Sequence, residues 1–97
     1  MSDHSQTDIE ASVFRHLLDH LDQHKEDVQN IELMITADFC RNCLAKWYVK
    51  AAEEHGQELD YEQARTIIYG MPYSEWKDLY QKKATPEQMA AFEARGK

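Results

Sequence analysis

The sequence lacks any apolar run approaching the roughly 18 residues that a membrane-spanning helix needs. Its first residues, MSDHSQTDIE, lack the basic start and apolar stretch of a secretory signal. Only two cysteines are present, Cys40 and Cys43. These features predict a cytoplasmic chain that does not enter a membrane. In a reducing compartment its cysteines are expected to be thiols and not a structural disulfide.

Basic residues are also scarce, with 11 Lys and Arg against 18 Asp and Glu, for a net charge of -7. The imbalance falls in residues 1–38, where nine acids face only Arg15 and Lys25. Residues 39–97 hold nine acids and nine bases. Because an acidic surface repels a phosphate backbone, nucleic acid is not expected as a partner.

The familiar motifs of enzymes are missing as well. The chain contains no glycine-rich phosphate loop, no G-x-S-x-G and no H-E-x-x-H. Its abundant acids look like solvated helix faces. The sequence therefore favours a protein that is not an enzyme.

Alternation with a period of two is absent too, so no strands are expected. Apolar residues instead recur with helical spacing, and 97 residues suffice for one small domain. We predict an all-α fold, with a flexible tail over 1–8 and one domain over 9–97. Five or six short helices should form an orthogonal or irregular array, starting near residues 9, 28, 38, 60, 73 and 86 and including one from about 38 to 54. Thr7 or Asp8 is the expected first cap, and Gly96 should end the last helix.

Within the helix predicted over 38–54, Cys40 and Cys43 form a Cys-x-x-Cys pair. Side chains three apart on a helix begin about 5 to 6 Å apart, whereas a disulfide needs roughly 3.5 to 4.5 Å between its β carbons. A disulfide inside the helix would be strained, and a shared metal ion fits better. Burial as ordinary core remains the main alternative. A redox role is another, if Cys40 lies in the first turn, where the helix dipole and Arg41 would lower its pKa.

A metal site needs further ligands, and histidines recur at His16, His20 and His24. His20 lies at the margin of the apolar stripe on the first predicted helix. It would meet the cysteines if the first and third helices pack together. Cys40, Cys43 and His20 are thus the candidate ligands for zinc or another transition metal.

Aromatic residues cluster in two places. Trp47 and Tyr48 follow the cysteines, while Tyr69, Tyr73 and Trp76 surround a turn at Gly70-Met71-Pro72. With Arg41, these residues are candidates for a partner interface or a ligand pocket. The spacing of Tyr73, Trp76 and Tyr80 is also what core packing requires, and that interpretation is favoured.

These stretches resemble a family of short bacterial proteins of unknown function, roughly the length of this chain. The resemblance rests on Asp27-Val28-Gln29-Asn30-Ile31, on FCRNCL with WY over 39–48, and on YGMPY with EW over 69–76, and it extends over 14–93. It implies a compact all-helical fold and carries no activity. The resemblance also covers the pattern Phe14-x-x-Leu17-x-x-His20-Leu21. It implies that the family has a histidine at the position of His20.

The sequence thus predicts a small helical protein that acts by protein contact and forms a homo-oligomer. Metal binding through Cys40, Cys43 and His20 is the first alternative. Thiol redox chemistry at the Cys-x-x-Cys is the second.

Overall fold

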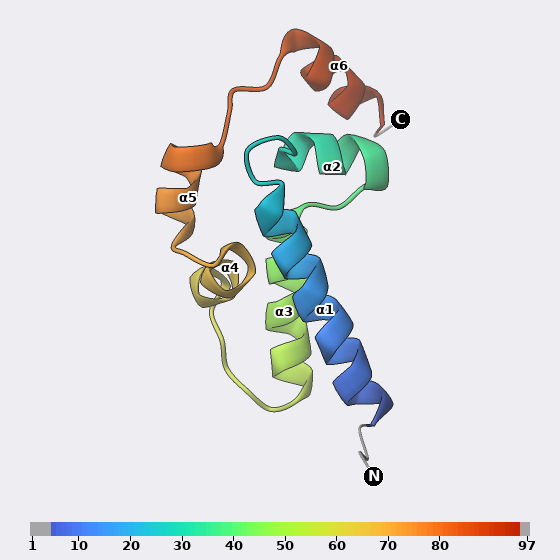
Figure 1. The fold of residues 1–97 in the computed structure, drawn as a ribbon, viewed down its shortest axis with the longest axis vertical. Coiled ribbons are helices and arrows are strands. Elements are labelled where there is room, and N and C mark those ends of the chain that lie inside the picture. The colour runs from blue at the N-terminus through green and yellow to red at the C-terminus, as the bar shows by residue number, and fades with distance from the viewer. Residues whose placement is uncertain (1–4, 96–97) are drawn as a thin grey trace.

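A computed structural model describes residues 5–95 of the chain (Figure 1). The described residues form helices and no strands, which confirms the all-α prediction. The helices are α1 (Gln6–Gln23), α2 (Asn30–Ala37), α3 (Arg41–Glu54), α4 (Tyr61–Tyr69), α5 (Tyr73–Tyr80) and α6 (Pro86–Ala94).

Helix α1 begins earlier than predicted, because its cap is Ser5 and not Thr7 or Asp8. The Ser5 hydroxyl accepts a hydrogen bond from the Asp8 N–H (3.2 Å), and the Asp8 carboxylate accepts one from the Ser5 N–H (3.3 Å). This reciprocal pair satisfies two backbone donors that a helix start leaves free. Residues 5–8 of the predicted tail form a cap and a first helical turn, and residues 1–4 lie outside the described residues.

The boundary between α2 and α3 also differs from the prediction. Asp38, predicted to open the third helix, instead closes α2 in the left-handed conformation with φ of 58°. A left-handed residue cannot continue a right-handed helix, so the chain turns and α3 begins only at Arg41. Cys40 becomes the residue that precedes the helix.

Helices α4 and α6 begin close to the predicted starts near residues 60 and 86. Asp60 accepts a hydrogen bond from the Gln63 N–H (2.7 Å) at the start of α4, and Gly70 ends that helix at φ of 77°. Thr85 caps α6 with Gln88 in the same reciprocal pattern, and Pro86 occupies its first position. The predicted end at Gly96 lies outside the described residues.

The helices form an elongated body of 53 × 27 × 24 Å (Figure 1). Helices α3 and α4 lie against each other, α6 packs on α2, and α5 follows α4 closely. An ion pair between Arg95 and Asp38 adds to the contact between α6 and the end of α2. The core lies where α1, α3, α4 and α5 meet and is built from Leu21, Leu44, Ala45, Ala64, Ile68, Tyr69 and Trp76.

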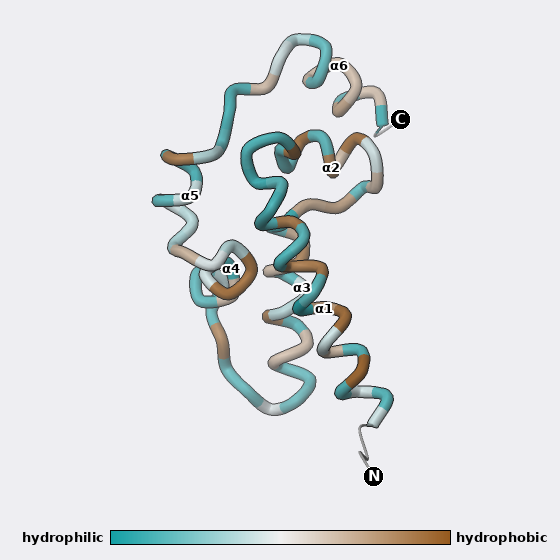
Figure 2. Tube along the Cα trace, in the orientation of Figure 1, coloured by the Kyte–Doolittle hydropathy of each residue, from teal (hydrophilic) through white to brown (hydrophobic). Residues whose placement is uncertain are grey.

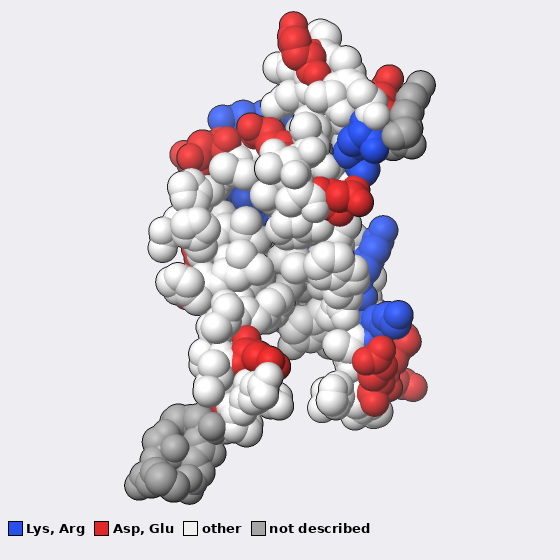
Figure 3. Space-filling model, turned by 90° about the vertical axis from the view of Figure 1, so that its right-hand side faces the viewer, with Lys and Arg blue, Asp and Glu red and all other residues white. Residues whose placement is uncertain are grey.

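The N-terminal half of α1 extends away from this core (Figure 1). In Figure 2 hydrophobic segments continue along α1 into that half. Figure 3 shows one long side of the molecule, where acidic and basic side chains gather in small separate groups and a broad area between them carries no charge. The fold therefore covers part of its apolar surface and leaves another part exposed.

Candidate functional site

The Cys-x-x-Cys lies at the start of α3 and not inside a helix as predicted. Cys40 is the N-cap in extended conformation (φ -148°, ψ 179°), and Cys43 is the third residue of the helix. Because only one cysteine has helical angles, the two sulfurs approach to 3.7 Å. Both cysteines are free thiols in the structure. The sequence argument for a strained disulfide assumed a helix through both residues, and that premise does not hold for Cys40.

Cys40 is buried and Cys43 is partly exposed. Burial raises the pKa of the Cys40 thiol, and hydrogen bonding to the backbone at Cys43 and Asn42 opposes this only in part. The lowered pKa that a reactive Cys40 would need is not found. Burial therefore favours the protonated thiol at Cys40.

A third sulfur lies beside the pair. The Cys43 thiol donates a weak hydrogen bond to the thioether of Met34, with the two sulfurs 4.0 Å apart. Met34 belongs to the last turn of α2, and the turn at Asp38 brings that end of the helix back to the start of α3. The sequence reasoning missed Met34, since nine residues and a non-helical turn separate it from Cys43.

His20 does not join the cysteines. It is exposed on α1, where its ring lies 4.9 Å from the ring of His24, and His24 in turn contacts Asp27 (Nδ1 to Oδ2, 3.1 Å). Over residues 5–95, no three His, Cys, Asp or Glu side chains are close enough to hold one metal ion. The ligand set of Cys40, Cys43 and His20 is therefore not assembled in this structure.

Arg41, a predicted surface candidate, is instead an internal cation, with 2% of its surface exposed. Its guanidinium donates to the side-chain oxygen of Asn30 (3.0 Å) and to the carbonyl of Leu21 (3.3 Å). It lies 5.2 Å from the ring centre of Trp76, close enough for a cation–π contact. Burial lowers the pKa of Arg41. Its role is to join α1, α2, α3 and α5.

Asn30 extends this network to α4. Its amide nitrogen donates to the Tyr69 hydroxyl (2.9 Å), which donates to the side-chain oxygen of Asn42 (2.8 Å). Burial raises the pKa of the Tyr69 hydroxyl well above its usual range. Tyr69 therefore acts as a neutral hydrogen-bonding group in the core.

The other aromatic candidates divide between core and surface. Trp76 is 1% exposed and stands among Tyr69, Tyr73 and Tyr80, so the favoured core interpretation of this cluster is confirmed. Tyr48 is half-buried against Phe14, with ring centres 6.4 Å apart. Trp47 differs from the rest, because 57% of it is exposed although its ring stacks on Phe39.

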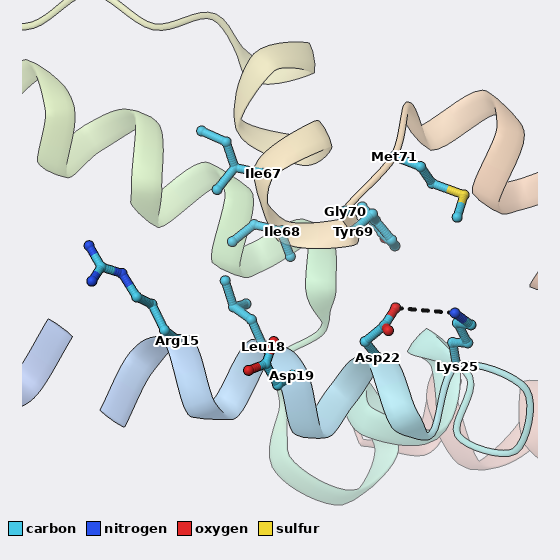
Figure 4. A pocket seen from close by; sticks show the side chains of 10 residues that line it. All are labelled: Arg15, Leu18, Asp19, Asp22, Lys25, Ile67, Ile68, Tyr69, Gly70 and Met71. Atoms are coloured by element: carbon cyan, nitrogen blue, oxygen red, sulfur yellow. Dashed lines mark hydrogen bonds and ion pairs between the residues drawn. The ribbon is translucent and has the colours of Figure 1, made fainter. Parts of the chain in front are cut away.

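A pocket of about 560 Å³ lies between α1 and the α4–α5 turn (Figure 4). Charged side chains of α1 form one wall and apolar residues of α4 the other. Asp22 is already paired with Lys25 (3.4 Å), and the described lining includes no cysteine, serine or histidine. Of the predicted site residues only Tyr69 borders it, and its hydroxyl is bonded elsewhere.

Residues 28–94 match a family described as protein of unknown function, DUF1244. The chain belongs to this family. The match covers α2 to α6, including the Cys-x-x-Cys and Arg41, and leaves all of α1 outside. A comparison with curated proteins finds no match.

No helix in the described part of the chain combines the length and apolar character needed to cross a bilayer. The family description names no activity.

Proposed function

We propose that this protein is a non-enzymatic interaction module that works by associating with a second copy of itself. The observation that carries the proposal is the apolar face on the N-terminal half of α1, which residues 5–95 leave exposed. Ile9 is 57% exposed and Val13 is 65% exposed. Being four residues apart on a helix, they lie on one face.

The same apolar stripe is used inside the molecule further along α1. Leu17 and Leu18 pack against the core, and Leu21 belongs to it. Full burial of an aliphatic side chain of this size is worth about 1.5 to 3 kcal/mol. The exposed half of the stripe does not contribute this free energy within one chain. A second copy that covers Ile9 and Val13 would gain it on association.

Charge opposes this association at low salt. Residues 1–38 carry nine acids and two bases, so two α1 helices brought together repel each other. Raising the salt from about 0.05 M to about 0.5 M shortens the screening length from above 10 Å to below it and should strengthen the dimer. An apolar interface with acidic surroundings should become stronger as the salt concentration rises, whereas an interface made of ion pairs should become weaker.

The test is light scattering and sedimentation of the reduced protein at micromolar concentration. The wild-type protein should be a dimer or larger, and Val13→Glu should be a monomer because a carboxylate cannot be buried in the interface. Thr7→Glu is the matched control, since it adds the same charge at an exposed position on another side of α1 from Ile9 and Val13. It should associate like the wild type.

A wild-type protein that stays monomeric at every salt concentration would overturn self-association. Equal weakening by both glutamate variants would also count against the proposal. That result would mean that added charge alone, and not loss of the apolar face, controls the assembly.

A second candidate function is thiol redox exchange, favoured by the 3.7 Å separation of the two sulfurs. Closing the disulfide moves the sulfurs to about 2.05 Å, a short displacement for an N-cap residue outside the helix. The two thiols would give up two protons and two electrons, and the disulfide of a partner would accept them to become two thiols.

This candidate is tested by equilibrating the protein in glutathione buffers of varied potential and measuring the internal disulfide by mass spectrometry. Formation of the disulfide within the range of cellular glutathione poise would support it. Absence of the disulfide in fully oxidised buffer would remove it. Because burial raises the pKa of Cys40, the exchange should be slow at neutral pH and become faster as the pH rises.

A further inference from the structure

Three sulfur atoms form a row where α2 ends and α3 begins. Cys43 stands in the middle, 3.7 Å from the Cys40 sulfur and 4.0 Å from the Met34 sulfur. Two of these groups are thiols that can lose a proton, and the third is a neutral thioether. The cluster is separate from the apolar face of α1 on which self-association is proposed.

These separations are those of sulfurs that share one metal ion. Two sulfurs each about 2.3 Å from a metal are about 3.8 Å apart at a tetrahedral angle and about 4.0 Å apart at a trigonal one. Both observed distances fall close to this range. Each of these two pairs is thus spaced like two ligands of one ion, and rotation about the flexible Met34 side chain would bring its sulfur to a third ligand position.

The ligand types select the class of metal. A thioether is a soft ligand, which favours Cu(I), whereas calcium and magnesium prefer oxygen. Structural zinc takes four ligands, and among residues 5–95 no His, Cys, Asp or Glu completes a set with the two cysteines. Cu(I) is stable with two or three sulfur ligands and needs no further group.

The surroundings also suit a site of net charge -1, the sum of Cu(I) and two thiolates. Cys40 lies at the amino end of α3, where the helix dipole and free N–H groups favour negative charge. Its charge would also interact favourably with the buried guanidinium of Arg41. Metal binding would release the two thiol protons to solvent, and the partly exposed Cys43 provides a route to the ion.

We propose that Cys40, Cys43 and Met34 form a three-sulfur binding site for Cu(I). The site replaces His20, the third ligand predicted from sequence, with the thioether of Met34. It requires only residues that the fold already holds together.

The experiment is an anaerobic titration of the reduced full-length protein with Cu(I) in the presence of bicinchoninate as a competing chelator. The wild-type protein should take one equivalent from the chelator. X-ray absorption of that complex should show three sulfur neighbours at about 2.3 Å. A parallel titration with Zn(II) should show weaker binding.

Met34→Leu is the decisive variant, because leucine keeps most of the volume and removes the sulfur. Loss of even an outer-shell partner typically costs about 10 to 100-fold in metal affinity, so loss of a ligand should cost at least about 10-fold. Met89→Leu on the exposed face of α6 is the matched control and should bind like the wild type. Circular dichroism of both variants establishes that each is folded.

Three outcomes would overturn the proposal. The first is a wild-type protein that takes less than half an equivalent of Cu(I) from the chelator. The second is unchanged Cu(I) affinity in folded Met34→Leu, which would reduce the site to a pair of thiols. The third is an absorption spectrum that requires nitrogen or oxygen neighbours, since it would place a different residue on the metal.

Discussion

The two ends of α1 lie in opposite environments. At its carboxyl end the Leu21 carbonyl accepts from the internal guanidinium of Arg41, and the surrounding polar groups are bonded to one another. At its amino end Ile9 and Val13 are exposed, and no side chain among residues 5–95 covers them. The carboxyl end is held by specific buried contacts, whereas the amino end leaves apolar side chains exposed.

Residues at the carboxyl end of α1 stabilise the fold, whereas residues at its amino end are free to contact another molecule. A buried cation held by neutral acceptors and an aromatic ring leaves little freedom for a ligand. Exposed aliphatic side chains contribute almost nothing to the stability of the isolated chain. Substitutions at the first end should therefore change the free energy of unfolding, and substitutions at the second should change assembly.

The largest effect is expected for Trp76→Ala. Removing this fully buried ring takes away its contacts with Tyr69, Tyr73 and Tyr80 and should lower the free energy of unfolding by about 3 to 5 kcal/mol. Trp47→Ala is the control, because Trp47 is mostly exposed, and it should cost less than about 1 kcal/mol. Urea denaturation measures both. Equal losses would mean that the two tryptophans are not divided between core and surface.

A smaller effect is expected at Arg41. Arg41→Ala removes the stem packed near Trp76 and the charged hydrogen bonds, and should cost about 2 to 4 kcal/mol. Arg41→Met keeps the stem and avoids burying a cation, so it should cost about 1 kcal/mol or less. Lys46→Ala on the exposed face of α3 should stay within about 0.5 kcal/mol of the wild type. A methionine variant as unstable as the alanine variant would show that the charge itself is required.

The smallest effect concerns the turn after α1. A hydrogen bond from His24 lowers the pKa of Asp27 below its ordinary value. When a carboxyl group has a lower pKa in the folded state than in the unfolded state, it stabilises the fold at pH values above the pKa of the unfolded state. This stabilisation is lost as the pH falls through the pKa of the folded state. His24→Ala should therefore raise the pKa of Asp27, as measured by NMR titration, and weaken the fold slightly above about pH 4. His16→Ala should not move it, and an unchanged Asp27 pKa in His24→Ala would contradict the assignment.

Much of the helical architecture was predictable because its signals are local. Asp60 with Gln63, Gly70, and Thr85 with Pro86 and Gln88 mark helix ends through contacts within four residues. The cap at Ser5 was also readable, since Ser5 and Asp8 form the same kind of reciprocal pair. The prediction missed this cap because it placed the helix start next to the apolar stripe that begins at Ile9.

The candidate site was less predictable, because its geometry depends on one backbone conformation. Asp38 has a residue type that begins helices more often than it ends them, yet here it adopts positive φ and closes α2. That single turn moved Cys40 out of the helix, brought its sulfur toward Cys43 and placed Met34 beside the pair. Periodicity carries no information about such a turn.

By itself the sequence determined the helical class, most helix boundaries, the acidic first part and the presence of a Cys-x-x-Cys near two aromatic residues. These follow from composition and from interactions between neighbours along the chain. Only the tertiary structure decided that Arg41 is internal, that His20 lies apart from the cysteines and that Met34 joins them. Those outcomes depend on how distant helices pack, and packing is fixed by the whole set of buried contacts and not by any one segment.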